Sequence, residues 1–132
     1  MNAATRATLD IERFEAGHVD AESFDHEAHV YVAWLFLRHF DPAEAIGRFD
    51  GALRRLTVKL GVPEKYHATI TWLFLLLINE RSRQGEDWSA FRTRNRDLVE
   101  GSGGTLSRYY SDTVLFSDAA RERFVLPDRI AV

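Results

Sequence analysis

Two segments of the chain are apolar on nearly every helical face. They cover residues 30–37 and 70–78. A helix with apolar residues all round is buried on most of its faces. We therefore predict that these two segments form the central pair of helices in the fold.

The segment between them has the pattern of an amphipathic helix. Asp41 is a favourable N-cap, Pro42 suits the first helical position, and Glu44 lies three residues after the cap. Apolar residues then recur at intervals of three and four, which places them on one stripe. Gly61 is suited to end the helix. We predict a helix over residues 42–60 that covers the central pair; its stripe consists of Ala45, Ile46, Phe49, Ala52, Leu53, Leu56 and Leu60.

Local signals give the bounds of the central helices. Ser23 is a suitable N-cap for a first helix that reaches about residue 39. Pro63 is expected to open a helix over residues 63–83, which Gly85 ends. A short helix capped by Asp87 follows.

The two ends of the chain have weaker patterns. Residues 1–20 show little periodicity, so we expect a flexible arm, or one clamped against a single helical domain over residues 21–132. After a glycine-rich loop, we expect helices over 106–110 and 117–123, a strand candidate over 113–116, and an extended tail over 124–128. The predicted fold is an all-α, compact helical bundle with up-down-up central helices, short C-terminal helices and an extended tail.

Three of the five histidines lie near the starts of the two central helices. His26 and His29 belong to the first of these helices, and His67 to the second. Because the connections before and after the amphipathic helix are short, successive helices are expected to be antiparallel. The starts of the two central helices then lie at the same end of the bundle, and the three imidazoles share one level.

Three imidazoles at one level have the composition of a metal site. Imidazole nitrogen binds transition metals such as zinc, iron or copper, and three protein ligands with an open position are typical of a catalytic centre. One hypothesis is therefore a metal held by His26, His29 and His67. Glu64 with His67 matches half of the carboxylate–histidine motif of di-iron bundles, but the second such motif is missing.

The same histidines also suit a pocket without a metal. Neutral histidine acts as a general acid or base near neutral pH, so the three histidines are candidate catalytic residues. The leading interpretation is a small-molecule-binding protein with a histidine-lined pocket, with enzymatic activity left open. Candidate substrate-binding residues are Tyr66, Thr71, Arg108, Tyr109 and Tyr110, with Arg108 as the anion contact.

A non-catalytic role is the alternative. Histidines near helix starts are often satisfied by backbone groups or water, and Trp34, Phe36, Trp72 and Phe74 are first of all core residues. The chain would then be an interaction or dimerisation module whose histidines are structural. A homodimer is compatible with this alternative.

Composition narrows the class of protein. Of the 132 residues, 45% are hydrophobic and 28% are charged, as in ordinary globular domains. A net charge of −3 makes nucleic acid or an anionic membrane an unexpected partner. The chain has no cysteine, which excludes thiolate ligands and fits a reducing cytoplasm. No apolar run approaches the roughly 20 residues that span a bilayer.

Several short motifs resemble those of an uncharacterised family of small bacterial proteins. They are Phe24-Asp25-His26-x-x-His29, Ala33-Trp34, Tyr66-His67-x-Thr69-x-Thr71-Trp72, Arg108-Tyr109-Tyr110-Ser111, Ala120-Arg121 and Phe124-Val125-x-Pro127-Asp128. The resemblance covers most of the chain from about residue 24 and implies a bacterial origin and a self-contained domain. The expected bundle is also similar to the metal-binding helical bundles related to DinB, which use three histidines in a different order and spacing.

Overall fold

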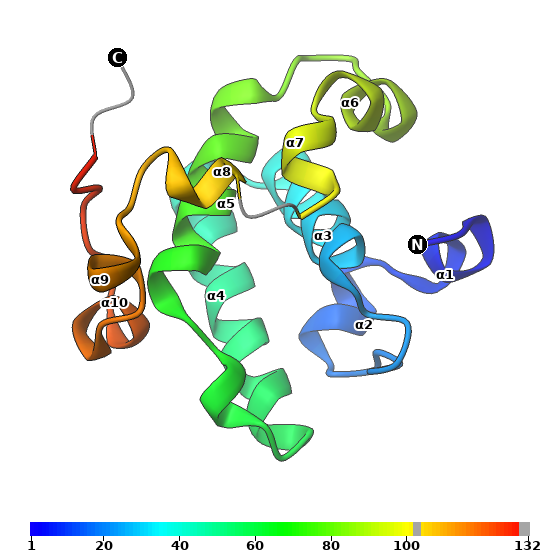
Figure 1. Ribbon diagram of the computed structural model, residues 1–132. Helices are drawn as coiled ribbons and strands as arrows, with labels where there is room; N and C mark the ends of the chain where they lie inside the picture. Colours follow the sequence, from blue (N-terminus) through cyan, green and yellow to red (C-terminus); the bar gives the residue numbers. More distant parts are fainter. Residues whose placement is uncertain (102–103, 130–132) are drawn as a thin grey trace.

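The protein consists of helices joined by turns and extended segments (Figure 1). The computed structural model describes residues 1–101 and 104–129, and no strand occurs within these ranges. The all-α prediction is therefore confirmed. The helices are α1 (Ala3–Thr8), α2 (Ile11–Glu15), α3 (His26–His39), α4 (Pro42–Lys59), the 3-10 helix η1 (Pro63–Lys65), α5 (Ala68–Arg81), α6 (Trp88–Arg94), α7 (Arg96–Val99), α8 (Gly104–Ser107), α9 (Asp112–Leu115) and α10 (Asp118–Glu122).

The centre of the fold is formed by α3, α4 and α5, each of which contacts the other two. Figure 1 shows α4 running opposite to α3 and α5, which confirms the up-down-up arrangement. On α4, the predicted stripe is buried as far as Leu56, whereas Leu60, the C-cap residue, is exposed. On α5, buried residues occur at Leu73, Leu75 and Leu77 as well as Ile78, so several faces of this helix are covered, as its apolar sequence indicated.

Polar side chains cap the starts of the three central helices. Asp41 caps α4 as predicted, because its carboxylate accepts a hydrogen bond from the Glu44 N–H at 3.0 Å. Asp25, rather than Ser23, caps α3. Pro63 opens only η1, and α5 begins at Ala68 with His67 as its N-cap. The expected start of the last central helix at Pro63 was wrong, because the chain is extended at Tyr66 and His67 before it turns into α5.

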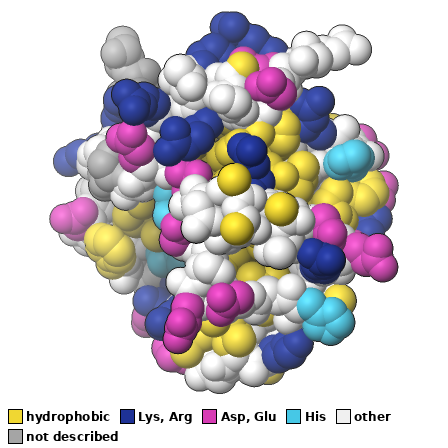
Figure 2. All heavy atoms as spheres, turned by 90° about the vertical axis from the view of Figure 1, so that its right-hand side faces the viewer, with side chains coloured by type: hydrophobic (Ala, Val, Ile, Leu, Met, Phe, Trp, Pro, Cys, Tyr) yellow, Lys and Arg dark blue, Asp and Glu magenta, His cyan; other side chains and the backbone are white. Residues whose placement is uncertain are grey.

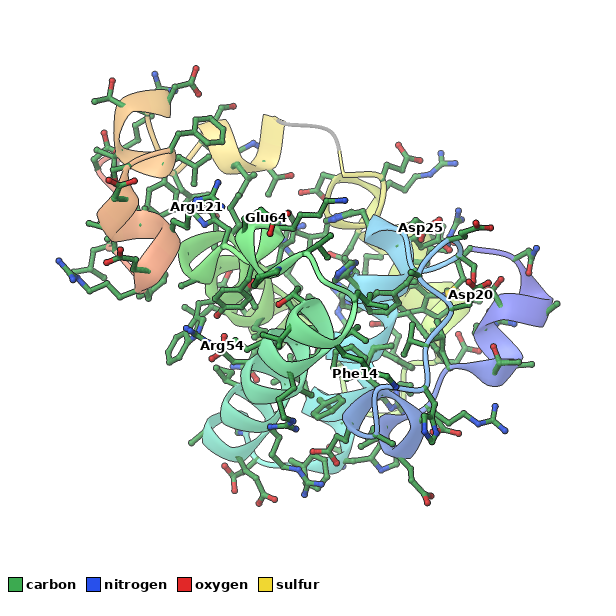
Figure 3. All side chains as sticks on the ribbon, turned by 90° about the horizontal axis from the view of Figure 1, so that it is seen from below. Phe14, Asp20, Asp25, Arg54, Glu64 and Arg121 are labelled. Atoms are coloured by element: carbon green, nitrogen blue, oxygen red, sulfur yellow. The ribbon has the colours of Figure 1, made fainter. Side chains whose placement is uncertain are left out.

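The N-terminal segment forms two short helices instead of a flexible arm. Phe14 of α2 is fully buried; its ring stacks on Phe49 of α4 at 5.1 Å between centroids and meets Phe36 of α3 edge-on at 5.8 Å. Figure 3 shows Phe14 between α2 and α4. Of the two expected forms of this segment, the one clamped against the helical domain is therefore found, because the buried Phe14 ring is part of the core.

The C-terminal part packs against α5 through short helices and an extended tail. Ser117 caps α10 as predicted. The strand candidate over residues 113–116 was wrong, because Ser111 caps the helix α9 there. The helix expected over 106–110 lies earlier, in α8. The tail is extended as predicted, and the Val125 N–H donates to Thr69 Oγ1 at 3.1 Å.

Charged side chains of both signs are mixed on the surface. Figure 2 shows acidic and basic side chains interspersed over the side on which α1 lies, so this side has no large area of one charge. None of the helices in the described ranges combines the length and hydropathy that a membrane crossing requires.

Candidate functional site

A cavity of about 590 Å³ lies between α3, α4 and α5, and we call it the central cavity. Most of its lining residues are apolar, and each of the three helices contributes residues spaced three or four apart, which is one helical face. The segment before α3 and the η1 region complete the wall. The lining residues are Ala21, Phe24, Asp25, His26, His29, Val30, Ala33, Phe49, Leu53, Leu56, Thr57, Leu60, Val62, Lys65, Tyr66, His67, Ile70, Thr71, Phe74, Leu75 and Ile78.

The sizes of neighbouring side chains help to explain why the space is not filled. Phe49 of α4 lines the cavity, and its ring meets that of Phe36 on α3 edge-on at 5.6 Å between centroids. The α3 face turned to the cavity carries Val30 and Ala33. These two side chains are short and therefore occupy little of the space between the helices.

His26 is tied to α7. Its Nε2 lies 2.7 Å from the Leu98 carbonyl oxygen, and because a carbonyl only accepts, Nε2 carries the proton. Its ring meets Phe74 edge-on at 4.9 Å. The backbone of Gly101 covers the ring so closely that a Cβ there would lie 2.7 Å from His26 Cδ2. The His26 side chain therefore connects α3 to the end of α7 by a hydrogen bond and is closely packed there.

His67 uses both ring nitrogens to hold backbone groups. Nδ1 accepts a hydrogen bond from the Ile70 N–H at 3.2 Å, and Nε2–H donates to the Leu115 carbonyl at 2.7 Å. Burial lowers the pKa of His67 below the usual histidine value. The ring is therefore neutral near pH 7, with neither nitrogen free for a ligand.

His29 has one nitrogen engaged and one free. Nδ1 lies 2.8 Å from the Asp25 carbonyl oxygen, so Nδ1 carries the proton and donates. Within the described part of the chain, Nε2 has no hydrogen-bond partner, although His29 borders the central cavity. Burial is the main cause that lowers the pKa of His29. The ring thus presents an unprotonated nitrogen.

The three histidines border one cavity, as the topology predicted, but their nitrogens do not converge. Among residues 1–101 and 104–129, no group of three histidine, aspartate or glutamate side chains is placed to hold a metal ion. The reason is that each imidazole is bonded to a different carbonyl, on Leu98, Asp25 or Leu115. The described residues therefore give no support to a metal site formed by His26, His29 and His67, which stays a prediction.

Tyr66 and Thr71 line the central cavity as expected, yet their hydroxyl groups are engaged within the protein. The Tyr66 hydroxyl donates to the Asp50 carboxylate, and the Arg54 guanidinium lies 4.2 Å above the Tyr66 ring. Burial and the hydrogen bond to Asp50 raise the pKa of Tyr66 far above its usual value. The Thr71 hydroxyl donates to the His67 carbonyl at 2.8 Å. Both residues therefore shape the wall.

Arg108, Tyr109 and Tyr110 do not line the central cavity. Tyr110 is buried, its hydroxyl donates to the Val125 carbonyl, and burial raises its pKa to about 12. The Tyr109 carbonyl accepts from the Arg129 N–H at 2.9 Å. The tyrosines thus hold the extended tail, while Arg108 lies 3.8 Å from the Asp97 carboxylate. These three residues lie in the segment between α8 and α9, away from the lining of the central cavity, and their role in substrate binding stays a prediction.

The sequence prediction missed the contribution of α4 and of the segment before α3. Leu53, Leu56 and Thr57 form one wall, and Phe24 forms another. The spacing of the α4 residues indicated a buried stripe but could not show that part of it faces an open space. Phe24 also borders a second cavity of about 320 Å³, which Thr5, Leu9, Arg13 and His18 line with neighbouring residues.

Comparison of the chain with protein-family models, with curated proteins and with solved structures finds no match. The resemblance to small bacterial proteins stays a prediction.

Proposed function

We propose that the protein binds a small, largely apolar molecule in the central cavity. The observation that carries this proposal is a partly open space of about 590 Å³ bordered by one face each of α3, α4 and α5. Ligand pockets are typically concave, largely apolar and between about 300 and 1,000 Å³ in volume. The central cavity matches this description in volume and in lining.

Packing defects do not account for a cavity of this size. Protein interiors are close-packed, and most internal voids are no larger than a few water molecules. One water occupies about 30 Å³ of the liquid. The central cavity is many times larger and is partly open to the surface, so it is a cleft that a ligand can enter.

The state of the polar wall residues supports an apolar ligand. The hydroxyl groups of Tyr66 and Thr71 donate to protein acceptors, and both His67 nitrogens are bonded to the backbone. Tyr66, Thr71 and His67 therefore offer no free polar group to a ligand. Because most of the other lining residues are apolar, affinity is expected to come mainly from the burial of apolar surface.

Titration with biphenyl, an apolar probe, tests the proposal. A ligand that binds only the folded state raises its melting temperature, so we expect biphenyl to raise the Tm of the wild-type protein. Leu53→Trp and Ala33→Leu each place a larger side chain in the cavity wall and should abolish this rise. The control Leu126→Trp changes a residue that is 76% exposed and should leave it intact.

Two results would contradict the proposal. One is a wild-type protein whose Tm is unaffected by biphenyl up to its solubility limit. The other is an undiminished rise in both cavity-filling variants, once circular dichroism shows that they are folded.

Because the chain has no cysteine, we also propose a reducing compartment such as the cytoplasm as its setting.

A further inference from the structure

We infer that His29 selects ligands that carry a hydroxyl group, by accepting a hydrogen bond from that hydroxyl at Nε2. The inference rests on the proposed binding of a small molecule in the central cavity, and it names the chemical group that this molecule carries. A phenol or an alcohol with an apolar body is the class of ligand that fits.

The tautomer of His29 makes Nε2 a hydrogen-bond acceptor. The Asp25 carbonyl oxygen, 2.8 Å from Nδ1, can only accept, which fixes the proton on Nδ1. Nε2 of the neutral ring is then an acceptor with a lone pair. The Phe24 ring lies 4.1 Å from the His29 ring, centroid to centroid, and limits its rotation from the other side.

The His29 ring is uncharged at neutral pH. Burial lowers the pKa of His29, the nearby His26 lowers it further, and the Asp25 backbone and carboxylate oppose these effects. The net effect is a lowered pKa, so the ring is neutral at pH 7. A neutral ring with its proton on Nδ1 has no donor to offer at Nε2.

The other polar groups of the wall differ from His29 Nε2, because most of them are engaged within the protein. The nitrogens of His67 are both bonded, and the hydroxyl groups of Tyr66 and Thr71 are directed to protein acceptors. The His26 ring is covered by Gly101 and Phe74. Asp25 and Thr57 also line the cavity, but the Asp25 carboxylate accepts from the Ala28 N–H and pairs with the Met1 ammonium, and the Thr57 hydroxyl donates to the Arg54 carbonyl. The Lys65 ammonium has donors only. Within the described part of the chain, His29 Nε2 is thus an acceptor of the wall that has no hydrogen-bond partner.

An acceptor in an apolar wall discriminates between ligands of similar shape. A hydroxyl can donate to Nε2, whereas an ether oxygen has no proton and leaves both acceptors desolvated and unpaired. For this reason, a site whose acceptor pairs with a ligand hydroxyl binds analogues without the hydroxyl proton less tightly. One hydrogen bond contributes about 0.5–1.5 kcal/mol, which corresponds to a preference of about two- to tenfold.

The test compares the Kd of 4-phenylphenol with that of 4-methoxybiphenyl by isothermal titration calorimetry. For the wild-type protein we expect the phenol to bind about two- to tenfold more tightly than the ether. In His29→Phe the ratio should fall to about one. The control His39→Phe changes an exposed histidine outside the cavity and should keep the wild-type ratio.

Nitrogen-15 spectra of the wild-type imidazoles give a second readout that needs no variant. We expect His29 to show an unprotonated Nε2 whose resonance moves on addition of 4-phenylphenol and not on addition of 4-methoxybiphenyl. A protonated Nε2 in the free protein would overturn the inference.

The outcomes separate this inference from the proposed function. If both probes bind equally well to the wild-type protein and Leu53→Trp blocks both, ligand binding stands and hydroxyl selection is overturned. A wild-type ratio that persists in His29→Phe also overturns hydroxyl selection by His29. If neither probe binds, the proposed function and the inference fail together.

Discussion

At the scale of single residues, His67 joins two parts of the chain that are far apart in sequence. Its ring caps α5 through the Ile70 N–H and binds the Leu115 carbonyl through Nε2. Loss of an N-cap costs about 0.5–2 kcal/mol, and an unpaired buried carbonyl adds to this cost. We predict that His67→Ala lowers the free energy of unfolding by about 1–3 kcal/mol, measured by urea denaturation.

The matched variant His67→Asn retains a side-chain acceptor for the Ile70 N–H. Asparagine is among the best N-cap residues. We therefore expect His67→Asn to lose less stability than His67→Ala. Equal losses in the two variants would contradict a capping role for this side chain.

The lowered histidine pKa values predict a dependence of stability on pH. Burial holds the pKa of His29 and of His67 below about 6.5, the usual value of a histidine, which applies to the unfolded chain. Below this pH the unfolded chain binds more protons than the folded one, so stability falls as pH falls. Above it, both states are neutral and the contribution is fully present.

We expect the urea midpoint to decrease from pH 7.5 to pH 5.5. Carboxylates with lowered pKa values, such as Asp25 and Glu86, add to the loss only at more acidic pH, because their unfolded values lie near 4. His67→Ala should show a smaller decrease over this range. A midpoint that is constant or that rises on acidification would contradict the neutral state of these rings.

Gly101 is the second residue with a clear structural requirement. Its φ is +67°, which favours glycine, and a Cβ there would meet the His26 ring. We predict that Gly101→Ala lowers the free energy of unfolding by about 1–3 kcal/mol. The control Gly47→Ala lies within α4 with nothing within 4 Å and should stabilise the protein by up to about 1 kcal/mol. Thermal or urea unfolding measures both, and a stabilised Gly101→Ala would show that the site is not strained.

At the scale of elements, local signals predicted the helices with complete cap and stripe patterns. Asp41 and Pro42 placed the start of α4, and Gly61 with φ +74° follows its end as expected. The start of α5 was misplaced because Pro63 fits the first position of a 3-10 helix as well as that of an α-helix. The β-branched residues around Thr113 favoured a strand, but the Ser111 cap and tertiary packing made this segment helical.

The N-terminal helices were missed because each spans too few turns to show a period. Phe14 nevertheless makes them part of the core. We predict that Phe14→Ala lowers the free energy of unfolding by about 3–5 kcal/mol. The control Leu126→Ala, at an exposed side chain, should change it by less than about 0.5 kcal/mol. If chemical denaturation gave similarly small changes in the free energy of unfolding for both variants, Phe14 would not anchor α2 to the core.

At the scale of the whole molecule, topology predicted the position of the site better than its chemistry. Short connections correctly placed His26, His29 and His67 around one cavity. The direction of each ring could not be predicted, because it depends on carbonyls of Leu98 and Leu115, whose positions depend on the packing of the C-terminal half. The open space itself arises from the spacing between helices, which no local pattern encodes.

The most direct test of the account is to locate a bound ligand by intermolecular nuclear Overhauser effects. With methyl-labelled protein and 4-phenylphenol, we predict effects at the methyl groups of Leu53, Ile70 and Ile78, which line the central cavity. Methyl groups of the exposed residues Val58 and Leu126 should show none. Effects confined to these exposed methyl groups, or no effects at a saturating ligand concentration, would contradict the account.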